Sequence, residues 1–130
     1  ASIMKKLLVL LFSIIFSPTS FAGWTWVTDS TDGTEFYMDY ESIKNDNGYH
    51  YYYYMINLLE PDQDGDLSYA LYHKVDCKSS RFKNLSEYYY TNKMGTGGLT
   101  TNNVKNPDWK YPPPGSMTQT MQDELCNYVK

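Results

Sequence analysis

The chain contains only two cysteines, and their places limit the folds that it can adopt. Cys77 ends a run of residues with a strand-like pattern, and Cys126 lies in the last segment, where apolar residues recur with helical spacing. A bond between the two would hold a C-terminal helix against a β-sheet. A free-thiol role is the alternative, although the chain has no Cys-x-x-Cys motif.

Residues 1–22 have the layout of a secretory signal peptide. Lys5 and Lys6 give a positive start, an apolar run extends from Leu7 to Phe16, and small residues precede a cleavage site after Ala22. The apolar run is shorter than the roughly 20 residues that a transmembrane helix needs, which disfavours the alternative of an uncleaved membrane anchor. Because no cysteine lies near the cleavage site, we do not expect a lipoprotein.

Export bears on both the cysteines and the charge of the remaining domain, residues 23–130. Cysteines of exported proteins commonly pair because the compartment is oxidising. The full chain has a net charge of −4, and removal of residues 1–22, which contain two lysines and no acidic residue, makes it −6. An acidic protein is poorly suited to bind nucleic acid or anionic lipid. We therefore expect a disulfide-bonded domain in the periplasm or at the cell surface, with neither of these partners.

The domain contains about six segments with strand-like patterns. They are residues 24–28, 34–39, 49–59, 67–77, 81–91 and 99–101. Asp32-Gly33 is a hairpin signal, residues 40–43 suit one helical turn, and residues 45–48 (Asn-Asp-Asn-Gly) suit a turn. This alternation of strands and turns predicts a β-sheet.

The last segment predicts one helix over residues 117–128. Ser116 and Gln119 form a capping-box pattern directly after Gly115. The apolar stripe of this helix consists of Met117, Met121, Leu125, Cys126 and Val129. Because the stripe includes Cys126, the helix should pack on one face of the sheet with its disulfide against that sheet. The predicted fold class is α+β.

Tyrosine is frequent, with 14 residues in a chain of 130, and five of them lie in the run 49–59. Both faces of that run carry large side chains, as in a central strand. The side chains that we place toward the core are Tyr52, Tyr54, Ile56 and Leu58, and those toward the other face are Tyr51, Tyr53 and Met55. The opposite assignment stays open, because a slip of one residue exchanges the two faces.

Tyr51, Tyr53 and Met55 are therefore the candidate binding or dimer face. Tyrosine contributes contact area at a low cost in conformational entropy, so an exposed row of tyrosines suits recognition of a protein partner. Ordinary packing of rings over the sheet is an alternative interpretation, and a small-molecule or glycan site is a third.

Two groups of residues suggest a metal site, and neither is complete. Asp62, Asp64 and Asp66 carry carboxylates at alternate positions, but an EF-hand loop from Asp62 would need glycine in place of Leu67 and an acid in place of His73. His50 and His73 fall on strands that could be neighbours, yet no third zinc ligand accompanies them. We expect a solvated hairpin loop and no metal.

No group of residues suits catalysis. The chain has no Gly-x-Ser-x-Gly motif, and Ser116 is used by the helix cap. The glycine-rich stretch 94–98 lacks the lysine and the following helix of a phosphate-binding loop, so it predicts a mobile connector. We expect no catalytic residues and no cofactor.

Several short motifs follow one another in a specific order along the domain. They are Trp26, residues 36–39 (Phe-Tyr-Met-Asp), 76–78 (Asp-Cys-Lys), 94–97 (Met-Gly-Thr-Gly) and 114–116 (Pro-Gly-Ser), and then Cys126. This succession resembles the bacterial surface-adhesin protein E family over essentially the whole domain. The resemblance implies a single antiparallel sheet of about six strands with a C-terminal helix tethered by a Cys77–Cys126 disulfide. It also implies a Gram-negative source and a homodimer.

The founding member of that family is a surface lipoprotein that binds laminin, vitronectin and plasminogen of the host. The present chain lacks the lipidation cysteine of that protein. The resemblance implies an exported, non-enzymatic binding module for a protein partner, with these host proteins as candidates. A periplasmic small-ligand-binding or envelope-stress protein is the alternative.

Overall fold

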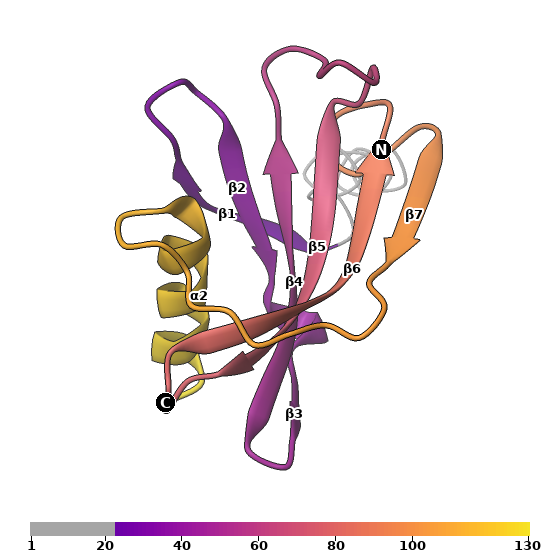
Figure 1. Ribbon diagram of the computed structural model, residues 1–130. Helices are drawn as coiled ribbons and strands as arrows, with labels where there is room; N and C mark the ends of the chain where they lie inside the picture. The colour runs from indigo at the N-terminus through magenta and orange to yellow at the C-terminus, as the bar shows by residue number, and fades with distance from the viewer. Residues whose placement is uncertain (1–22) are drawn as a thin grey trace, which may run out of the picture.

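The computed structural model describes residues 23–130, which form one antiparallel sheet with a single α-helix on one side (Figure 1). The strands are β1 (Trp24–Asp29), β2 (Glu35–Asp39), β3 (Lys44–Asp46), β4 (Tyr49–Asn57), β5 (Ser68–Asp76), β6 (Arg81–Tyr90) and β7 (Leu99–Asn103). The order across the sheet is β1-β2-β4-β5-β6-β7, and β3 pairs with the part of β4 that β2 does not reach. A 3-10 turn, η1 (Tyr40–Ser42), and the helix α2 (Met117–Tyr128) complete the fold.

These elements confirm the predicted α+β class and the helix boundaries. The predicted signal peptide, residues 1–22, lies outside the described residues.

The strand β3 was not predicted, and it raises the number of strands to seven. The turn is tighter than the predicted 45–48 stretch, because Asn47 and Gly48 alone adopt positive φ, at 53° and 83°. Two successive left-handed residues make a turn whose twist matches a hairpin. Lys44–Asp46 can therefore pair with Tyr49–Tyr51. All three residues of β3 are exposed, so the strand has no apolar alternation to reveal it in the sequence.

The core lies between the sheet and α2. Tyr52, Tyr54 and Val75 are at most 2% exposed, and they pack with Met121 and Leu125, which are fully buried. The predicted assignment of Tyr52 and Tyr54 to the helix side of β4 is confirmed. Alternation along the strand then places the intervening tyrosines on the other face.

His73 belongs to the same core. It is 3% exposed, its ring stacks on Phe82 at 4.6 Å between centroids, and it meets Tyr54 edge-on at 5.1 Å. Burial lowers the pKa of His73 to about 3, so the ring is neutral at physiological pH. His73 is thus a core residue.

The helix α2 is fixed at both ends. At its start, the Ser116 hydroxyl accepts a hydrogen bond from the Gln119 amide at 3.2 Å, and Gln119 Oε1 accepts one from the Gly115 amide at 2.8 Å. Near its end, Cys126 forms the predicted disulfide with Cys77, which directly follows β5. The helix therefore presents its apolar stripe to one face of the sheet, and within residues 23–130 the other face has no helix on it (Figure 1).

A β-bulge divides β6 into two halves. Tyr72 pairs with Ser86 and His73 pairs with Asn84, so Leu85 has no partner on β5. An extra residue exchanges the two faces of the strand beyond it. From Arg81 to Asn84, the odd-numbered side chains therefore point away from α2. From Ser86 to Tyr90, the even-numbered side chains do so.

Candidate functional site

The face of the sheet opposite α2, which we call the open face, carries a row of aromatic rings. The register places Trp26, Tyr37, Tyr53, Tyr72 and Tyr88 on it. Tyr53 and Tyr72 lie directly opposite each other on β4 and β5, and their rings stack at 4.2 Å between centroids. Tyr51 and Tyr88 flank this pair, with centroids 6.1 Å from Tyr72 and Tyr53, respectively. The open face is therefore a continuous aromatic surface at its centre.

Met55 requires a correction to the predicted binding face. It points to the open face, but it is fully buried and cannot contact a partner. The segment at Gly95 covers it so closely that a Cβ on Gly95 would lie 2.6 Å from Met55 Cε. The Met94 amide donates to Asn57 Oδ1 at 2.9 Å, and the Gly95 amide donates to Ser68 Oγ at 3.0 Å. The glycine-rich connector is thus anchored to the sheet and acts as a cover.

A hollow of about 350 Å³ lies beside this cover. Its lining consists of Trp24, Asp39, Tyr53, Ala70, Tyr88, Tyr90 and Gly95. Burial and the neighbouring Tyr88 raise the pKa of Tyr53 to about 12. The Tyr53 hydroxyl therefore stays protonated at physiological pH and can donate a hydrogen bond to a ligand.

A second hollow of about 530 Å³ lies on the other side of the tyrosine pair. Lys44, Asn45, Asp46, Tyr51 and Tyr72 line it. Tyr51 and Tyr53, the two predicted residues that remain accessible, are thus brought together through Tyr72 and face separate hollows. Tyr72 and Tyr88 could not be assigned to this surface from the sequence, because the assignment depends on the register between strands.

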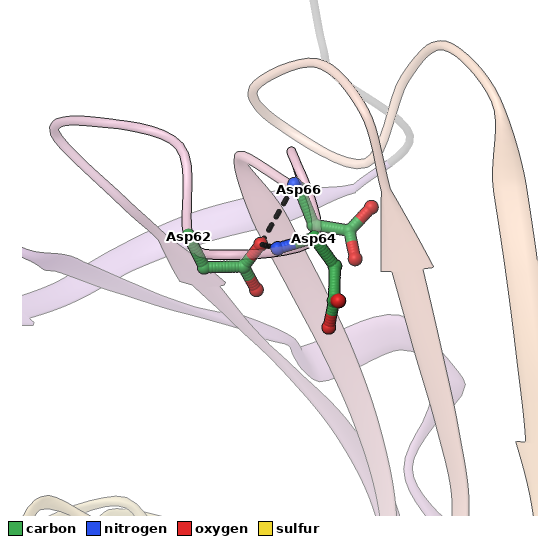
Figure 2. Close-up of side chains that lie close together, drawn as sticks. All are labelled: Asp62, Asp64 and Asp66. Atoms are coloured by element: carbon green, nitrogen blue, oxygen red, sulfur yellow. Dashed lines mark hydrogen bonds between the residues drawn. The ribbon is translucent and has the colours of Figure 1, made fainter.

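The acidic loop between β4 and β5 brings three carboxylates together. Oxygen atoms of Asp62, Asp64 and Asp66 lie within 4.8 Å of one another (Figure 2). Asp62 Oδ1 accepts hydrogen bonds from the amides of Asp64, at 3.0 Å, and Asp66, at 2.9 Å (Figure 2). Its other oxygen accepts one from the Tyr69 hydroxyl, and these bonds lower the pKa of Asp62. The carboxylate of Asp62 therefore already serves to close the turn, as in a hairpin loop.

Replacement of Asp62 by alanine should destabilise the loop. We expect Asp62→Ala to lower the melting temperature by roughly 5 °C, because it removes the acceptor of two amides and one hydroxyl. Asp64→Ala is the matched control, since it removes a carboxylate from the same loop that repels Asp66. Circular dichroism during heating measures both variants, and an equal loss in Asp64→Ala would contradict the role of Asp62 in the turn.

The two histidines, His50 and His73, form no metal centre with other described residues. His50 pairs with Val75 and His73 pairs with Tyr52, so the two lie on the helix side of adjacent strands but are offset along them. Within residues 23–130, neither belongs to a group of three converging metal-ligand side chains.

Comparison with known proteins identifies the family. The family model described as surface-adhesin protein E matches residues 24–127. The chain belongs to this family. Membership in the surface-adhesin protein E family indicates an adhesin-like protein that is exported or displayed at the cell surface. A comparison with curated protein sequences finds no match.

Solved structures of Haemophilus influenzae protein E share the fold of this family member. Crystal form II of that protein aligns with a TM-score of 0.63 at 18% identity, over 84% of this chain and 91% of that chain. A second structure gives 0.60 at 17%, over 82% and 86%. Protein E from a non-typeable strain gives 0.58 at 16%, over 78% and 75%. Among residues 23–130, no helix is both long and apolar enough to span a membrane.

Proposed function

We propose that this chain is an exported, non-enzymatic module that binds a protein partner through the open face. The observation that carries the proposal is the row of rings around the Tyr53–Tyr72 stack, which no helix of the described part of the chain covers. Aromatic residues are enriched at the centres of protein interfaces, where they provide contact area that is already rigid. The host proteins that the family suggests, laminin, vitronectin and plasminogen, are the first partners to test.

The hydroxyl groups of these tyrosines add specificity to that surface. Burial raises the pKa of Tyr53 to about 12 and also raises the pKa of Tyr72 and Tyr90. Neutral hydroxyls cost less to desolvate than charged groups, and each can donate and accept a hydrogen bond. Such a surface suits a partner that brings both apolar area and polar groups.

The proposal predicts that Tyr53 is an energetic centre of binding. Tyr53→Ser should weaken binding of the mature protein, residues 23–130, to its partner by roughly 10-fold or more, because truncation removes the stacked ring at the centre of the surface. Tyr128→Ser is the control, because Tyr128 is 59% exposed but lies on α2. Biolayer interferometry against immobilised laminin, vitronectin and plasminogen measures the affinities.

The affinities, together with sedimentation of the free proteins, separate three cases. Equal losses in the two variants, or unchanged affinity in Tyr53→Ser, would remove the open face as the binding surface. If the wild type sediments as a dimer and Tyr51→Ser/Tyr53→Ser as a monomer, the partner is a second copy of the chain. If none of the three host proteins binds and the wild type sediments as a monomer, the proposal fails.

The hollow beside Tyr53 favours a second candidate function, a periplasmic small-ligand-binding protein. Its volume of about 350 Å³ and its lining of aromatic rings with one carboxylate suit a small ligand.

The location of the protein in the cell separates the two candidate functions. We propose cleavage of residues 1–22 without lipidation, and protease treatment of intact cells should degrade the protein if it is displayed. Full protection would favour the periplasmic candidate.

A further inference from the structure

One end of the open face gathers positive charge in an otherwise acidic chain. Lys74 on β5 and Lys83 on β6 lie directly opposite each other, and alternation places Arg81 on the same face. All three surround Trp109. Their charged groups lie 5.8 Å (Lys74 Nζ), 4.9 Å (Lys83 Nζ) and 4.4 Å (Arg81 Cζ) from the centroid of the Trp109 ring. We call these four residues, with Tyr49, the basic cluster.

The segment between β7 and α2 builds this cluster by crossing the sheet (Figure 1). Lys110 and Phe82 exchange two backbone hydrogen bonds of 2.8 Å, which fix Trp109 beside β6. The Trp109 ring lies 5.4 Å from that of Tyr49, and Lys74 Nζ lies 4.4 Å from the Tyr49 centroid. The rings hold the cations in place through cation–π attraction, so the cluster is formed before any ligand arrives.

Two of the three charges of the cluster, those of Lys74 and Lys83, are not balanced by acids. Arg81 pairs with Asp76 at 3.1 Å, whereas within residues 23–130 neither Lys74 nor Lys83 has a carboxylate within salt-bridge distance. Like charges directly opposite each other on neighbouring strands destabilise a sheet. Because the chain as a whole has a net charge of −4, its composition does not explain why two unneutralised lysines face each other here. The rings hold the two cations without neutralising them, which points to an anionic ligand.

The charges also extend in a row across the sheet. Lys44, Tyr51, Lys74 and Lys83 face one another in register on β3, β4, β5 and β6. With strands about 4.8 Å apart, the row from Lys44 to Lys83 spans about 14 Å. A single small anion cannot reach both ends, so the row fits a chain with repeated negative charges.

The sheet disfavours an acidic peptide as that chain. β4 and β5 are interior strands with paired backbone groups, and beside Lys83 the outer edge of β6 is occupied by Lys110, which bridges to Phe82, so a peptide has no free edge here to which it could add as a further strand. A peptide laid over this face would lose water from its own amide groups without gaining the backbone hydrogen bonds of a β-ladder in return. An acidic polysaccharide carries sulfates or carboxylates at repeated intervals and does not depend on a backbone ladder.

We propose that the basic cluster binds an acidic polysaccharide, whose sulfates or carboxylates the ammonium groups of Lys74 and Lys83 receive. This binding goes beyond the proposed recognition of a protein partner, which uses the tyrosines farther along the same face. Because the contacts are ionic, the affinity falls as salt rises and counterions compete.

Heparin is the probe that tests this proposal. Isothermal titration with the mature protein at about 50 mM NaCl should show binding, and Lys74→Gln and Lys83→Gln should each weaken it roughly 5-fold or more. Each variant should also reduce the slope of log affinity against log salt by about 1. Lys93→Gln is the matched control, because Lys93 is exposed in the connector after the opposite end of β6, and its affinity should stay within about 2-fold.

Two further ligands and one variant complete the test. Desulfated heparin should bind much more weakly, and poly-L-glutamate should bind less tightly than heparin at equal charge. No binding of heparin, or an equal loss in Lys93→Gln, would overturn the proposal. Equal binding of poly-L-glutamate would replace the polysaccharide with an acidic polypeptide. Tyr53→Ser should keep its heparin affinity, so failure here is separable from failure of the protein-binding proposal.

Discussion

Removal of the Cys77–Cys126 disulfide is expected to lower the free energy of unfolding by about 4 kcal/mol. The bond closes a loop of 49 residues, and without it the unfolded chain gains the entropy of that loop. The loop contains β6, β7 and most of α2, so the bond restrains half of the folded domain. The residues around it, including Val75 and Leu125, are core residues, so separation of the helix would also expose apolar surface.

The measurement compares the wild type with Cys77→Ser/Cys126→Ser by thermal denaturation. A loss of about 4 kcal/mol corresponds to a decrease in melting temperature of roughly 20 °C for a domain of this size. The double variant avoids a free thiol that could cross-link two molecules. Dithiothreitol supplies the control, because it should lower the wild-type melting temperature and leave the variant unchanged. Equal melting temperatures of wild type and double variant would refute the role of the bond.

Acidification should destabilise the protein through His73. Burial lowers the pKa of His73 to about 3 in the folded state, whereas an exposed histidine in the unfolded chain has a pKa of about 6.5. Between these two values the unfolded state binds a proton that the folded state rejects. Stability is therefore complete above about pH 6.5 and falls as the pH decreases, by about 1.4 kcal/mol for each unit. Between pH 7 and pH 4.5 the expected loss is about 2–3 kcal/mol.

His73→Phe isolates this contribution. Phenylalanine keeps an aromatic ring against Phe82 and Tyr54 but cannot bind a proton. Urea denaturation of both proteins between pH 5 and pH 7, where most carboxylates stay ionised, gives the difference in free energy at each pH. The wild type should lose stability relative to His73→Phe as the pH falls. Parallel curves would show that His73 does not titrate between the two states as its burial requires.

Local signals explain what the sequence could predict. The helix over residues 117–128 has a cap at Ser116 and an apolar stripe, and both signals lie within a few residues of the helix itself. Alternation also divided the residues of the β4 segment into two sets, one on each face of the sheet, but it left open which set faces the helix. The helix and this division depend on periodicity within one element and needed no knowledge of how the strands align.

Features that depend on distant contacts were missed. Met55 is buried because Gly95, 40 residues later, lies on it, and no local pattern reports that contact. The basic cluster depends on the register of β5 and β6, which brings Lys83 opposite Lys74. The net charge of the chain concealed this patch, because a sum over all residues contains no information about their positions.

The bulge at Leu85 determines which chemistry each end of the open face presents. If the pairing of Tyr72 with Ser86 continued without it, Asn84 would stand opposite Lys74, and Arg81 and Lys83 would point toward α2. One extra residue thus lets a single strand supply tyrosines to one half of a surface and cations to the other half of the same surface. A slip of the Arg81–Asn84 half of β6 by one residue would therefore turn its cations toward α2 and leave Tyr88 and Tyr90 in place, so the two halves of the surface can change independently during evolution.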